Sequence, residues 1–142
     1  MASAISRKET TNDPSKSVLA KVYACEAETA APFAASLAAG SPCEVAYTPS
    51  FVDGIGGKSM LPEMWPLAST LLEGSLVVSL REIAEAIRLL VERNHVIAEG
   101  AGAASVAAAL FGKLQARRIV CVVSGGNIDA VKLAKILQGQ LP

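Results

Sequence analysis

The residues best suited to bind a ligand form the segment Ser124-Gly125-Gly126-Asn127. It follows an apolar, β-branched run at 119–123, which is typical of a buried strand in a parallel sheet, and it precedes apolar residues at helical spacing. At such a junction, free backbone N–H groups and the helix dipole favour a bound anion. The glycines let the backbone approach a flat or phosphorylated ligand, and the Ser124 hydroxyl can donate or accept a hydrogen bond. The alternative is an ordinary tight turn, with Asn127 as the helix N-cap and Asp129 complementing the dipole.

Two further segments contain acidic residues that could contribute to a site. Glu99 opens an alanine-rich helix expected over 99–111, where its carboxylate could serve a ligand or simply complement the helix dipole. Asp53 and Gly54 lie within 41–59, a long stretch dominated by turn-forming residues. Long irregular stretches in compact domains are often functional, so this stretch is a candidate part of the site.

Residues with metal-binding side chains form no recognisable metal site. Glu26 and Glu28 follow the first expected strand and could reach a cation, but two carboxylates rarely suffice for a hard cation. His95 is the only histidine, which argues against a histidine-based metal site or catalytic triad. We therefore expect no metal site.

The elements that must position these residues alternate between strands and helices. Strands are expected at 21–25, 76–78, 95–98 and 119–123, and helices at about 30–39, at 61–72, after a capping box at 79–82, at 99–111 and after residue 127. This alternation indicates an α/β protein, with a partial doubly wound, mainly parallel sheet of about four strands and helices on both faces. Residues 18–142 would form this single domain, and 1–17 a divergent N-terminal segment or arm.

Composition limits the partners and the location. The 142 residues are 51% hydrophobic and 18% charged, and the 13 basic and 13 acidic residues give zero net charge, so neither nucleic acid nor a membrane is expected as a partner. The longest apolar stretch, 101–112, is too short to span a bilayer. The first seventeen residues are polar, unlike a secretory signal, and the three cysteines form no C-x-x-C pair. We expect reduced thiols and a cytoplasmic location.

Four motifs in a fixed order resemble a known enzyme family. They are Val22-Tyr-Ala-Cys-Glu26, Thr48-Pro-Ser-Phe-Val-Asp-Gly-Ile55, Glu99-Gly-Ala-Gly-Ala103 and Ser124-Gly-Gly-Asn127. Together they resemble the C-terminal half of threonine dehydratase and serine racemase, of the tryptophan-synthase-β type (fold type II) of pyridoxal-phosphate enzymes. The resemblance runs from about residue 18 to the end. Residues 1–5 resemble the helix that follows the family's phosphate loop, and 6–17 would be a divergent insert or surface arm.

The resemblance implies a cofactor and a role for each candidate residue. The cofactor would be pyridoxal phosphate, bound by the Ser124-Gly125-Gly126-Asn127 loop. The Ser124 hydroxyl would form a hydrogen bond with the nitrogen of the cofactor ring. Asp53 and Gly54 would lie close to the cofactor, and Glu99 would help to position water and protons. The family reaction is a β-elimination that converts a hydroxy amino acid into a 2-oxo acid and ammonia.

The sequence also departs from the family pattern. It contains neither the cofactor-binding lysine motif Ser-x-Lys-x-Arg nor the four-glycine phosphate loop. The family's cation-binding glutamate, carbonyl and aspartate would fall on Glu26, Ala30 and Pro32, and proline has no carboxylate. We therefore expect a truncated fragment or split half that is inactive alone and does not bind pyridoxal phosphate covalently. The alternatives are a subunit that completes an enzyme with a separate N-terminal half, and a non-catalytic module for a small anion. Uncovered apolar surface would favour a homo-oligomer.

Overall fold

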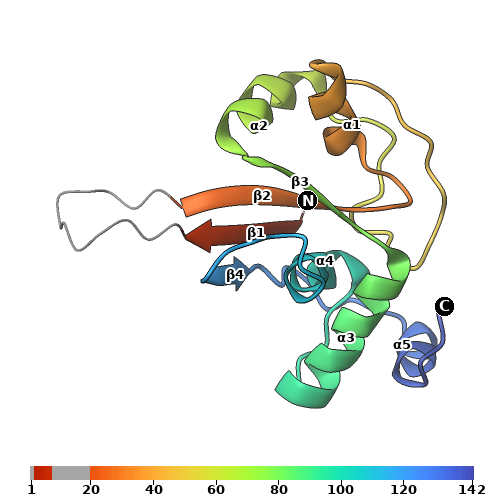
Figure 1. Cartoon of the computed structure of the whole chain (residues 1–142). Helices are drawn as coiled ribbons and strands as arrows, with labels where there is room; N and C mark the ends of the chain where they lie inside the picture. The colour runs from red at the N-terminus through yellow and green to blue at the C-terminus, as the bar shows by residue number, and fades with distance from the viewer. Residues whose placement is uncertain (1, 8–19) are drawn as a thin grey trace, which may run out of the picture.

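The computed structural model describes residues 2–7 and 20–142. Figure 1 shows their elements, which are β1 (Ala2–Arg7), β2 (Ala20–Ala27), α1 (Pro32–Ala39), the 3-10 helix η1 (Pro62–Met64), α2 (Trp65–Leu71), β3 (Gly74–Val78), α3 (Leu80–Asn94), α4 (Gly100–Leu110), β4 (Ile119–Cys121) and α5 (Ala130–Leu137). None of the helices in this part of the chain is long and apolar enough to cross a membrane.

The four strands form one sheet in the order β3-β2-β1-β4. β2 and β3 are parallel, whereas β1 is antiparallel to both β2 and β4. β2, β3 and β4 therefore all run in one direction, and β1 alone runs against them. This confirms the predicted α/β class and a sheet of four strands, three of which run in the same direction.

Helices cover both faces of this sheet, as predicted. Neighbouring residues of a strand point to opposite faces, and Ala24 and Cys25 of β2 are both buried. Ala24 packs with Phe33 of α1 and Ala68 of α2, whereas Cys25 belongs to a larger cluster formed with α3 and α4. Hence α1 and α2 cover one face, and α3 and α4 cover the other.

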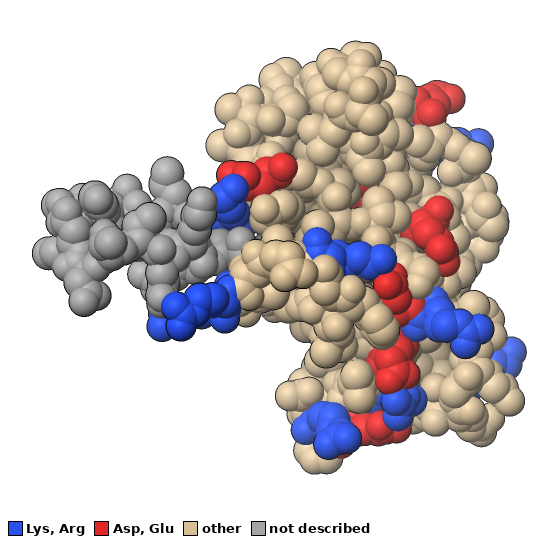
Figure 2. Space-filling view, in the orientation of Figure 1, with Lys and Arg blue, Asp and Glu red and all other residues tan. Residues whose placement is uncertain are grey.

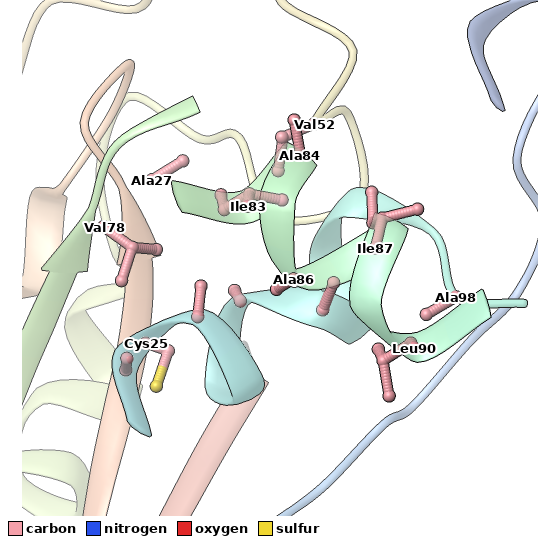
Figure 3. Close-up of a cluster of buried hydrophobic side chains, with 14 of the residues drawn as sticks. Cys25, Ala27, Val52, Val78, Ile83, Ala84, Ala86, Ile87, Leu90 and Ala98 are labelled. Carbon is pink, nitrogen blue, oxygen red and sulfur yellow. The ribbon is translucent and has the colours of Figure 1, made fainter. Parts of the chain in front are cut away.

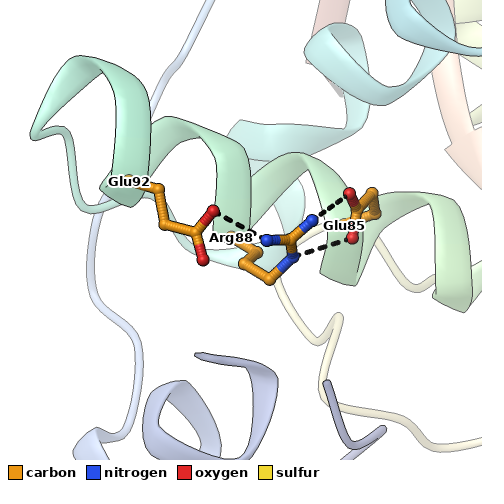
Figure 4. Close-up of polar contacts among 3 residues, drawn as sticks. All are labelled: Glu85, Arg88 and Glu92. Atoms are coloured by element: carbon orange, nitrogen blue, oxygen red, sulfur yellow. Dashed lines mark hydrogen bonds and ion pairs between the residues drawn. The ribbon is translucent and has the colours of Figure 1, made fainter. Parts of the chain in front are cut away.

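The larger cluster holds α3 against α4 and the sheet (Figure 3). Ile83 and Ile87 of α3 are fully buried in it together with Val78 of β3. The buried residues that α4 contributes to this cluster are all alanines, which lets the two helices and the strands approach closely. On the opposite side of α3, Arg88 pairs with Glu85 and Glu92 (Figure 4). These exposed ion pairs add little stability.

Capping residues fix both ends of α3. The predicted capping box is present, because the Glu82 N–H donates to Ser79 Oγ at 3.2 Å and the Ser79 N–H donates to Glu82 Oε2 at 2.7 Å. At the other end His95 adopts a left-handed conformation, with φ of 55°. The predicted strand at 95–98 is wrong, because this cap turns the chain directly toward α4 and leaves Val96 and Ile97 exposed.

Two further predictions are wrong, one of a helix at the N-terminus and one of the burial of the run at 119–123. Residues 2–5 form part of β1 and no helix, because their backbone groups pair with those of β2 and β4. The run at 119–123 is not buried: β4 lies at a sheet edge, and Val120 is 61% exposed. Most of the arm expected at 6–17 lies outside the described residues.

Candidate active site

The segment Ser124–Asn127 joins β4 to α5, as predicted, and contacts from both sides hold it. Before it, the buried Ser105 of α4 donates a hydrogen bond from Oγ to the Val122 carbonyl at 2.9 Å. After it, Asp129 Oδ1 accepts from the Val131 N–H at 2.7 Å and so caps α5. The N-cap is therefore Asp129, and the alternative with Asn127 as N-cap is wrong.

Glu99 lies directly against this loop. Its N–H donates to the Gly125 carbonyl at 3.0 Å, and a Cβ on Gly125 would overlap the Glu99 carboxylate. A Cβ on Gly102 of α4 would lie 2.6 Å from the same Gly125 carbonyl oxygen. The glycines therefore serve a close approach of the loop to the start of α4.

The Asp53-Gly54 segment packs on the same helix end. A Cβ on Gly54 would lie 2.9 Å from the Ala101 Cβ and 3.7 Å from Glu99 Oε1. Asp53 also reaches across to α5, because its Oδ2 lies 3.7 Å from Lys132 Nζ. Three segments that are far apart in the sequence thus converge on the N-terminus of α4.

The convergence leaves an open hollow of about 280 Å³ between α4 and α5. Its lining consists of Phe51, Asp53, Glu99, Asn127, Ile128, Asp129 and Lys132. Three carboxylates and one amine make the hollow acidic. Ser124 lies beside it in the same loop, exposed, and its hydroxyl makes no hydrogen bond to any other described residue.

Of the residues that line the hollow, sequence reasoning named Asp53, Glu99 and Asn127 as candidates. It did not name the other lining residues Phe51, Ile128, Asp129 and Lys132 as site residues, nor Gly102 of α4. Lys132 could have been found, because it lies three residues after Asp129 and therefore shares a helix face with it. Phe51 and Gly102 carry no such local signal, since their roles depend on contacts between distant segments.

Glu26 and Glu28 act as acceptors for helix N-termini. Glu26 is buried and accepts hydrogen bonds from the N–H groups of Phe33 and Ala34, both at 2.8 Å, and from Ser75 Oγ at 2.5 Å. Glu28 accepts from the Leu80 N–H at the start of α3, at 2.8 Å. Among residues 2–7 and 20–142, no group of three potential ligands is placed to hold a metal ion.

Comparison with known proteins identifies the family. The family described as "Pyridoxal-phosphate dependent enzyme" matches residues 1–125. The chain belongs to this family. The L-threonine ammonia-lyase of Thermotoga maritima is 36% identical to this chain over 119 residues. These residues make up 82% of this chain and 29% of the relative. The catabolic L-threonine dehydratase of Escherichia coli K12 is 32% identical over 120 residues, 82% of the chain and 36% of the relative.

Solved structures of similar enzymes also match this chain. The processed form of threonine deaminase isoform 2 from Solanum lycopersicum matches with a TM-score of 0.74 and 27% identity, over 83% of this chain and 36% of that chain. Maize serine racemase matches with a TM-score of 0.70 and 29% identity, over 82% and 39%. The predicted resemblance is confirmed, and pyridoxal phosphate is the cofactor of the family. The chain spans about a third of the length of the curated relatives it matches.

Proposed function

We propose that this chain supplies part of the active site of a pyridoxal-phosphate enzyme that converts threonine or serine into a 2-oxo acid and ammonia, and that it is inactive alone. The observation that carries the proposal is the convergence of Gly54, Glu99 and Gly125 at the N-terminus of α4. These residues belong to three of the four motifs that resemble the family. Their contact is what a shared site requires.

The residues of the loop fit the ring end of the cofactor. The Ser124 hydroxyl is exposed and free of hydrogen bonds within the described chain, so it can pair with a ring nitrogen. Gly125 and Gly126 present bare backbone beside it, which suits a flat ring. When bound, pyridoxal phosphate accepts the electrons released as a bond at the substrate α-carbon breaks. In this arrangement, Ser124 orients the ring and Gly125 and Gly126 border it.

Glu99 is the residue best placed to move a proton. It is half-buried, and its backbone is fixed by the hydrogen bond to Gly125. Its carboxylate lines the hollow together with Asp53 and Asn127. A positioned carboxylate of this kind can hold a proton at a water molecule or at the leaving hydroxyl of the substrate. The module for small anions is less favoured, because three carboxylates line this hollow.

Covalent attachment of the cofactor is not expected from these residues. Lys132 is the amine that lines the hollow, but it lies on α5 and pairs with Asp53. A cofactor bound to a lysine absorbs at roughly 410–420 nm. We expect the chain to retain no such absorbance band after incubation with pyridoxal phosphate and gel filtration. A retained band that Lys132→Ala removes, and that the neighbouring Lys135→Ala leaves, would contradict this expectation.

Co-expression tests the function. The partner is the part of the E. coli dehydratase that precedes the matched segment, and the assay follows 2-oxo acid release from threonine and serine. We expect activity only when both polypeptides are present, a loss of at least 100-fold in Glu99→Gln, and no loss in Glu92→Gln, an exposed control on α3. Full activity in Glu99→Gln would refute the role of Glu99.

We also infer a homo-oligomer in the cytoplasm. Leu67 and Leu71 of α2 are 52% and 63% exposed, and together with Leu61 and Met64 they border an apolar hollow of about 350 Å³. The surface over α1 and α2 carries few charged side chains in Figure 2, which favours contact with a second copy. The three cysteines form no disulfide within the part of the chain that the structure describes, which supports a reducing compartment.

A further inference from the structure

β1 differs in direction from every other strand of the sheet. It lies between β2 and β4 and is antiparallel to both, although β2 and β4 are parallel to each other (Figure 1). In doubly wound sheets the strands are joined by crossover helices and run in the same direction. The position between β2 and β4 is therefore one where a parallel strand would complete a uniform sheet.

The sequence of β1 is also weak for an interior strand. The residues of Ala2–Arg7 include one β-branched side chain, Ile5, and otherwise alanine, serine and arginine. Interior strands of parallel sheets are normally rich in valine and isoleucine, because both of their faces are covered. Here α4 packs across all four strands, so the position of β1 is at the centre of a helix-covered sheet. The strand with the lowest β-propensity thus occupies an interior position.

The comparisons suggest what else could occupy this position. The matched region covers only 36% of the tomato threonine deaminase and 39% of the maize serine racemase, so most of each similar fold has no counterpart in these residues. We propose that β1 is a displaceable strand, and that the slot between β2 and β4 binds a parallel strand from the part of the enzyme fold that carries the cofactor lysine and phosphate loop. This inference rests on the proposed function.

A native cysteine in β4 allows a direct test. The partner of Ala4 in β4 is Cys121, so Ala4→Cys would place two thiols opposite each other on adjacent strands. Oxidation would then lock β1 into the slot, and reduction would release it. Burial raises the pKa of the Cys121 thiol, so the oxidation needs alkaline pH and an added oxidant. Ser3→Cys is the matched control, because its partner in β2 is Ala24 and no disulfide can form.

The probe is the N-terminal part of the E. coli dehydratase that precedes the matched segment, and light scattering on a sizing column without cofactor measures binding. We expect the reduced Ala4→Cys chain and the control to form a complex, and the oxidised Ala4→Cys chain to bind at least ten-fold more weakly. Equal binding by the oxidised and reduced chains would overturn the proposal, and so would failure of the reduced chain to bind a soluble probe. The light-scattering assay measures binding without cofactor and so does not depend on activity. A complex that forms but releases no 2-oxo acid would therefore count against the proposed function and leave the strand exchange standing.

Hydrogen exchange tests displaceability without any probe. If β1 opens independently, the amides of Ala2–Arg7 exchange at least ten-fold faster than those of Tyr23–Ala27, the residues of β2 that pair with β3. Equal exchange in β1 and β2 would show that both open only with the whole sheet. That result would overturn the proposal.

Discussion

Replacement of Glu26 should destabilise the chain more than replacement of any other carboxylate described above. Glu26 is 5% exposed and accepts three hydrogen bonds, two of them from the N–H groups of Phe33 and Ala34. α1 has no side-chain cap of its own and begins at Pro32. Glu26 therefore acts as the cap of this helix from the neighbouring strand, and the helix dipole adds to the attraction.

The magnitude follows from the donors that lose their acceptor. In Glu26→Ala, two N–H groups at the start of α1 and the Ser75 hydroxyl lose their partner, and each unsatisfied buried donor costs about 1–3 kcal/mol. Relaxation and water entry reduce the sum, so we expect a total loss of about 3–5 kcal/mol in the free energy of unfolding. Glu26→Gln keeps one acceptor oxygen and should lose about half of that.

Urea unfolding at a fixed protein concentration measures this loss. Glu28→Ala is the matched control, because Glu28 is exposed and accepts a single bond from the Leu80 N–H. We expect it to cost about 0.5–1 kcal/mol, as for an ordinary exposed cap. Equal losses in Glu26→Ala and Glu28→Ala would refute the reasoning. Stabilisation of the unmodified chain by millimolar Mg²⁺ or Ca²⁺, lost in Glu26→Ala, would instead indicate a cation ligand.

Three further outcomes are expected. Burial alone would raise the pKa of Glu82, but hydrogen bonds from Ser79 and Lys113 outweigh burial and lower this pKa. The stability that these hydrogen bonds provide is therefore lost as the pH falls below about 4.5. Glu82→Gln should flatten that part of the pH profile of unfolding. Gly102→Ala should cost about 1–3 kcal/mol in urea unfolding, because the new methyl group meets the backbone of Gly125, whereas a cost below about 0.3 kcal/mol would contradict the close contact. Light scattering should give a mass above the 14.6 kDa of one chain, and Leu67→Glu should reduce it; a monomer mass for the unmodified chain would exclude the oligomer.

Elements with local signals could be predicted from the sequence. The capping box at Ser79 fixed the start of α3, and the helical spacing of its apolar residues predicted the face that is now buried against α4. β1 and the end of α3 at His95 could not be predicted. β1 depends on pairing with distant strands, and the end of α3 depends on a left-handed cap, a conformation that is uncommon for residues other than glycine. The exposure of β4 depends on sheet order, which local apolarity does not encode.

The candidate site shows the same division at the level of single contacts. The motifs predicted that Asp53, Glu99 and the Ser124–Asn127 loop belong together, but they did not predict how the three segments meet. The meeting point is α4, where Gly102 has only a hydrogen facing the Gly125 carbonyl. The Glu99 N–H donates to that same carbonyl. Because these contacts join the loop to the helix directly, the geometry of the Ser124–Asn127 loop does not depend on a bound cofactor. Gly102→Ala should therefore disturb the loop even in the chain alone, whereas Ser124→Ala should leave its stability unchanged and affect only what binds there.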